Sequence, residues 1–76
     1  MTHAQNAILR YAYKQHKAGI TKPALQYSKI CDDLSDVKNA LNCLQDGGYV
    51  EILSPAIGCA VIKLTDYGLS FCEQSF

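Results

Sequence analysis

The chain lacks the features that mark several classes of protein. It has no tryptophan, only two histidines, His3 and His16, and no Cys-x-x-Cys pair among its four cysteines. Without paired cysteine ligands we expect no zinc site. Neither histidine has a nucleophile at motif spacing, and no glycine-rich phosphate loop precedes a predicted helix. We therefore expect no enzyme activity, no cofactor and no small-molecule substrate.

Long apolar runs are also missing. The longest nearly unbroken run, residues 56–62, is far shorter than the roughly 18 to 20 residues of a membrane span. The first six residues carry no basic cluster, and no apolar stretch of signal-peptide length follows them. We expect a cytoplasmic protein without a membrane partner. Its 76 residues are enough for a single domain over residues 1–76.

Acidic residues are absent from the first part of the chain. Residues 1–31 contain five lysines and arginines and no acid, whereas residues 32–76 contain two lysines and seven acids, so the net charge is zero. A chain divided in this way can present a basic face that attracts a polyanion. The alternative is two solvated faces that attract each other within the fold or across a dimer. Both interpretations stay open.

The four cysteines are expected to be reduced and to pack as small apolar side chains. A disulfide or a redox role is the alternative. The cysteines are Cys31, Cys43, Cys59 and Cys72.

Helical spacing predicts three helices in the first two thirds of the chain. The first covers residues 4–17 and ends near Gly19. Residues 20–22 are at most a short edge strand, and a short helix over 24–32 follows, with Leu25 turned inward. Ser35 is the expected N-cap of a third helix that runs to residue 46. Its expected core stripe is Val37, Ala40, Leu41 and Leu44.

The remaining residues predict a β-hairpin and a last helix. The strands are residues 49–53 and 60–64. One register satisfies both the apolar alternation and the charges. It pairs Val50 with Leu64, Glu51 with Lys63 and Ile52 with Ile62. Thr65 is then the expected N-cap of a short helix over 66–74.

Two segments resemble the winged helix-turn-helix family of DNA-binding domains. Residues 37–51, with the sequence VKNALNCLQDGGYVE, resemble a recognition helix that leads into the first wing strand. Residues 64–68, LTDYG, resemble the end of the wing. Together with the order of elements, the resemblance extends over nearly the whole chain. It implies an α+β fold, with a three-helix core, a β-hairpin wing and a short C-terminal helix.

The resemblance also implies a function. The chain would be a sequence-specific transcriptional regulator that binds double-stranded DNA, with the helix over residues 36–46 in the major groove. Asparagine, glutamine and lysine can pair with base edges, and phosphates are bound by cations and hydroxyls. The expected base-reading residues are Lys38, Asn39, Asn42 and Gln45. The expected backbone contacts are Lys22, Tyr27, Ser28, Lys29 and Ser35.

A second apolar stripe on the first helix predicts a further surface. One small domain rarely covers two sides of a terminal helix, so this stripe favours a homodimer. The alternative is that the C-terminal helix covers it within the chain. The expected dimer contacts are Leu9, Tyr13, Phe71 and Phe76.

The wing departs from the family pattern. Its tip, residues 54–59, carries no charge, whereas the family's wings usually offer a cation there. This favours the alternative function, a winged helix protein-protein interaction module without DNA binding. Salt distinguishes the two, because phosphate contacts release counterions and weaken steeply as salt is added.

Overall fold

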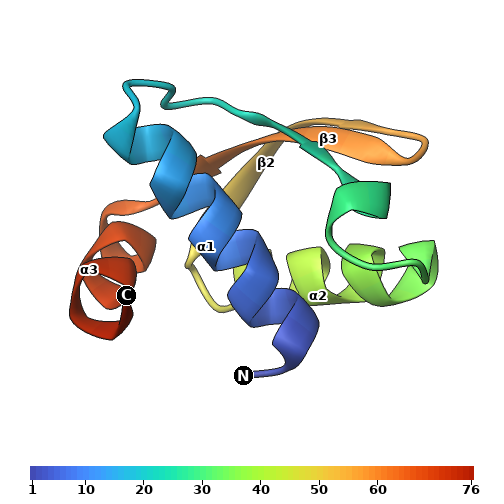
Figure 1. The fold of residues 1–76 in the computed structure, drawn as a ribbon, viewed down its shortest axis with the longest axis horizontal. Helices are drawn as coiled ribbons and strands as arrows, with labels where there is room; N and C mark the ends of the chain where they lie inside the picture. Colours follow the sequence, from blue (N-terminus) through green and yellow to red (C-terminus); the bar gives the residue numbers. More distant parts are fainter.

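Three α-helices lie against one face of a three-stranded antiparallel sheet (Figure 1). The computed structural model describes all residues, 1–76. The protein is therefore an α+β domain. None of its helices is long and apolar enough to span a membrane. In chain order the elements are α1 (His3–Lys17), β1 (Ala24–Gln26), the single 3-10 turn η1 (Tyr27–Lys29), α2 (Leu34–Asp46), β2 (Val50–Ala56), β3 (Cys59–Leu64) and α3 (Asp66–Ser75).

Helix α1 confirms the first predicted helix to within a residue. Thr2 and Gln5 satisfy each other's backbone amides: Thr2 Oγ1 accepts from Gln5 N at 3.2 Å, and Gln5 Oε1 accepts from Thr2 N at 2.9 Å. This reciprocal pair fixes the start of the helix. Gly19, with φ of +91°, follows the C-terminus in a left-handed conformation that glycine adopts without strain.

The predicted helix over residues 24–32 is wrong. Residues 24–26 form β1, and only the turn η1 is helical. β1 pairs with β3 in the register Leu25 to Ala60, which buries Leu25 between exposed neighbours. Residues 20–22, expected to be at most a short edge strand, lie in the loop before β1, and the strand begins four residues later. Pairing with a distant strand overrides the local helical spacing.

Helix α2 begins two residues earlier than predicted, and its N-cap is Asp33 rather than Ser35. Asp33 Oδ1 accepts hydrogen bonds from Ser35 N at 3.0 Å and Asp36 N at 3.3 Å. The predicted core stripe is confirmed, because Val37, Ala40, Leu41 and Leu44 are all buried.

The hairpin has the predicted register, with Val50 opposite Leu64, Glu51 opposite Lys63 and Ile52 opposite Ile62. Its strands are longer than predicted. β2 continues to Ala56 after a bulge between Ile52 and Ser54, so the turn consists only of Ile57 and Gly58. The sheet order is β1-β3-β2, which leaves β2 at an edge beside α2.

Helix α3 packs against α1 and closes the core. Thr65 caps it as predicted and accepts from Gly68 N at 3.0 Å. Gly68 approaches the backbone carbonyl of Tyr49 so closely that any side chain would collide with it. Cys72 is fully buried, with its thiol 3.8 Å from the carbonyl oxygen of Leu9. The C-terminal helix therefore covers the Leu9 side of α1 within the chain.

Candidate nucleic-acid interface

The outer face of α2 presents the predicted polar residues to solvent. The apolar stripe of the helix is buried, and Ser35, Lys38, Asn39 and Asn42 are exposed. Spacings of three and four residues keep them on one side of the helix. Side-chain amides and an ammonium group on an exposed helix face can present hydrogen-bond donors and acceptors to an external surface.

A groove of about 470 Å³ runs between this helix and the hairpin. Ser35, Lys38 and Asn42 form its helical wall. The opposite wall is apolar. Lys38 is the only charged residue in the lining, and no carboxylate lines the groove. The lining residues are Tyr27, Leu34, Ser35, Lys38, Asn42, Ile52, Pro55, Ala56, Ile57 and Gly58.

Gln45 differs from the other predicted base-reading residues because its side chain is hydrogen-bonded within the protein. Its Oε1 accepts a hydrogen bond from Ile52 N at 2.9 Å, which joins the last turn of α2 to β2. The acceptor half of this carboxamide is therefore engaged within the protein. A glutamine needs both its acceptor and its donor for a bidentate contact with adenine. In this structure the Gln45 side chain instead links the end of α2 to β2.

The edge of β2 is protected against pairing with another strand. Gln45 occupies the amide of Ile52, the bulge leaves Leu53 without a partner, and Pro55 has no amide hydrogen. Bulges and prolines are devices that prevent strand addition at sheet edges. A partner in the groove therefore meets side chains rather than a free row of backbone groups.

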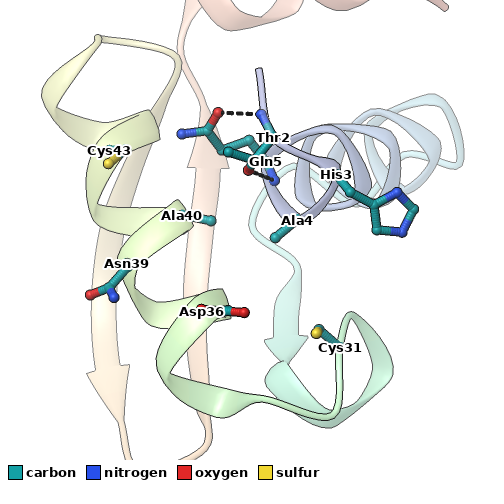
Figure 2. A pocket seen from close by; sticks show the side chains of 9 residues that line it. All are labelled: Thr2, His3, Ala4, Gln5, Cys31, Asp36, Asn39, Ala40 and Cys43. Atoms are coloured by element: carbon teal, nitrogen blue, oxygen red, sulfur yellow. Dashed lines mark hydrogen bonds between the residues drawn. The ribbon is translucent and has the colours of Figure 1, made fainter.

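A second hollow, of about 450 Å³, lies between the start of α1 and the other side of α2 (Figure 2). Asp36, Cys31 and Cys43 line it, and Asn39 stands at its outer rim and points away from α1. Asp36, the acid in the first turn of α2, thus lies on the side opposite the hairpin groove. No group of three or more His, Cys, Asp or Glu side chains is arranged to hold a metal ion.

The predicted backbone-contact residues fall into two groups. Ser35 and Tyr27 line the groove, and Tyr27 N donates to Gly58 O at 3.0 Å, so η1 is tied to the hairpin turn. Burial, with a smaller contribution from Cys59, raises the pKa of the Tyr27 hydroxyl, which stays protonated at neutral pH. Ser28 and Lys29 are exposed on η1 beside it. Lys22 lies in the bend before β1, outside the groove lining.

The predicted dimer surface needs one correction. Leu9 is fully buried in the core and has no surface left for a partner, so its assignment to a dimer contact is wrong. Tyr13 and Phe71 are half-buried and Phe76 is exposed. Arg10 lies 5.1 Å from the ring centre of Phe76, and Lys17 lies 5.2 Å from that of Tyr13. Cations therefore already cover two of these rings.

The cysteines are all unpaired thiols, with Cys43 exposed and Cys72 buried. Burial raises the pKa of the Cys72 thiol to about 11. This thiol is therefore neutral at physiological pH, as expected for a cysteine that fills the core.

The sequence alone did not indicate that Leu34 lines the groove or that Asp33 caps α2. Leu34 precedes the predicted helix start, but it is the first residue of α2, lines the groove and is exposed. Asp33 is of a residue type that caps helices, because an aspartate at the N-cap can accept hydrogen bonds from the amides two and three residues later.

Comparisons with family models, with curated proteins and with solved structures found no match to this chain.

Proposed function

We propose that the protein is a winged helix domain that binds double-stranded DNA and regulates transcription in the cytoplasm, with α2 as the recognition helix. The observation that carries the proposal is the outer face of α2. It presents Lys38, Asn39 and Asn42 to solvent beside a groove without carboxylates. Base edges and phosphates both require such donors, and a nearby carboxylate would repel the DNA backbone.

The order of the elements supports the winged helix assignment. A hairpin follows α2 directly, and the short strand β1 pairs with β3 to complete the sheet. The helix that the resemblance implies before the recognition helix is reduced to the turn η1.

The test selects binding sites from a random duplex library and titrates the enriched duplex by fluorescence anisotropy. Asn42→Ala is expected to weaken binding by about 1–3 kcal/mol, the cost of one lost base contact. Gln74→Ala is the matched control, since Gln74 is an exposed carboxamide on α3. No enrichment, or equal effects of the two variants, contradicts the assignment of α2 as the reading helix.

The proposal includes a homodimer in a narrower form than the sequence predicts. Without Leu9, its apolar contacts are Tyr13, Phe71 and Phe76 at the end of the molecule where α1 and α3 meet. Two recognition helices in a two-fold dimer read half-sites about one helical turn apart. A monomer in light scattering at micromolar concentration, together with enrichment of an asymmetric site, contradicts the dimer and leaves DNA binding intact.

A protein-protein interaction module without DNA binding is the second candidate. The observation that favours it is apolar exposure in the groove lining: Leu34 is 47% exposed and Ile57 is fully exposed. An apolar protein contact would be nearly indifferent to salt, whereas DNA binding weakens steeply with it. The protected edge of β2 limits such a partner to side-chain contacts.

A further inference from the structure

The hairpin ends in a single projecting apolar side chain. Ile57 is fully exposed and is the first of the two turn residues between β2 and β3. Gly58, with φ of +75°, supplies the left-handed conformation that this tight turn requires. Ala56 pairs with Cys59 directly below the turn, and Tyr27 N holds Gly58 O at 3.0 Å. The tip is therefore held in place by β-pairing and by η1.

The surroundings of the tip fit a polyanion. Lys38 lines the same groove as Ile57, and Lys29 is exposed on η1, which is bonded to the turn. No carboxylate lines the groove. Although the whole chain is neutral, the lining of this groove therefore carries one positive charge and no negative one. Strand addition by a protein partner is blocked at the β2 edge by Gln45 and Pro55.

We infer that Ile57 enters the minor groove of bound duplex DNA as an apolar wedge between two base pairs, while Lys29 holds the flanking backbone. The inference rests on the proposed DNA binding and specifies how an uncharged wing contributes to it. Apolar side chains inserted between base steps partly unstack them and bend the duplex. The preferred sites are flexible pyrimidine–purine steps, which unstack at the lowest cost.

The wedge has a signature that phosphate contacts do not share. Removing an apolar contact lowers affinity by nearly the same factor at low and at high salt. Removing a lysine–phosphate contact instead reduces the dependence of affinity on salt. Ile57→Ala and Lys29→Ala are therefore distinguishable even if both weaken binding. Both positions are exposed, so neither substitution should affect folding.

The experiment uses the duplex selected from the random library, with 2-aminopurine placed in turn at each purine and with fluorophores at both ends. The parent protein is expected to raise 2-aminopurine fluorescence at one step and to shorten the end-to-end distance. Ile57→Ala is expected to lose both signals and at least about tenfold in affinity, since it removes roughly three buried methylene equivalents. Ile20→Ala is the matched control, an exposed isoleucine between α1 and β1.

The experiment distinguishes a failure of the Ile57 wedge from a failure of the proposed DNA binding. If the parent binds the duplex but no position brightens, or if Ile57→Ala brightens the same position as the parent, the wedge is wrong and the proposed DNA binding stands. If Ile20→Ala weakens binding as much as Ile57→Ala, the effect is not specific to the tip and the wedge is wrong. If the parent binds no duplex at any salt concentration, the proposed function and the wedge both fail.

Discussion

Gln45 and Ile52 are joined by a hydrogen bond of 2.9 Å from the backbone amide of Ile52 to Oε1 of Gln45. It links the end of the proposed recognition helix to the edge strand of the hairpin. The spacing of helix and hairpin sets the width of the groove between them, so we assign Gln45 to positioning rather than to base reading. The same bond also occupies an amide that would otherwise be open to another strand.

Gln45→Ala should lower the free energy of unfolding by about 0.5–1.5 kcal/mol, the net contribution of one such hydrogen bond. Gln45→Glu keeps an acceptor oxygen and should lose less. Urea denaturation at pH 7 measures both, with Gln74→Ala as the control for an exposed carboxamide. Equal stability of Gln45→Ala and the parent would show that the bond does not hold the helix to the hairpin.

Substitution of Asp33 and of Ser35 by alanine tests which of the two residues caps α2. Asp33→Ala should cost about 1 kcal/mol, because two helix amides lose their acceptor. Ser35→Ala should change stability by less than about 0.5 kcal/mol, since its side chain makes no capping bond. Thermal and urea unfolding of the two variants check this order. A larger loss of stability for Ser35→Ala than for Asp33→Ala would indicate that Ser35 is the N-cap, as the sequence alone suggests.

Sequence patterns predicted the elements that satisfy two constraints at once. The hairpin register follows because apolar alternation and the Glu51–Lys63 pair require the same alignment, and α2 follows from its regular buried stripe. β1 could not be predicted in this way. Leu25 and Tyr27 do alternate with exposed neighbours, but three residues are too few for a pattern, and their partner strand lies more than thirty residues away. Pairing with a distant strand cannot be predicted from the spacing of nearby residues.

The candidate site was predicted in part for a similar reason. Helical spacing groups Lys38, Asn39 and Asn42 on one exposed face, since this depends only on the period of the helix. Gln45 has the same spacing, but its bond to Ile52 depends on where β2 lies. Leu9 was assigned to a dimer because its stripe is apolar, and only the packing of α3 shows what covers it.

Gly68→Ala should destabilise the fold by about 1–3 kcal/mol, the range for forcing extra atoms into a packed site. The added methyl would collide with the backbone carbonyl oxygen of Tyr49, and neither backbone can move without disturbing Thr65, which bonds to both. Ser70→Ala, at an exposed position of the same helix, is the control. Differential scanning calorimetry of both variants measures the effect. A Gly68→Ala protein as stable as the parent would contradict the close contact of α3 with the hairpin.

Because Cys72 is buried, the free energy of unfolding should decrease at alkaline pH. Its thiol has a pKa of about 11 in the fold, above its ordinary value of 9.0, so the unfolded chain releases the proton first as pH rises. Stability from this group is complete below pH 9 and is lost as pH rises toward 11. Urea unfolding of the parent and of Cys72→Ala from pH 8 to 11 should show a difference in stability that shrinks with pH. A constant difference would mean that the thiol does not titrate with unfolding.

The salt dependence of DNA affinity tests the central claim most directly. For the selected duplex we expect the logarithm of the association constant to fall linearly with the logarithm of salt concentration. Lys29→Ala should reduce the slope by about 0.9, the effect of one lost phosphate contact, while Lys63→Ala, opposite Glu51 in the hairpin, should leave it unchanged. An affinity that does not change with salt, or equal slopes for all three proteins, would contradict DNA binding through this face.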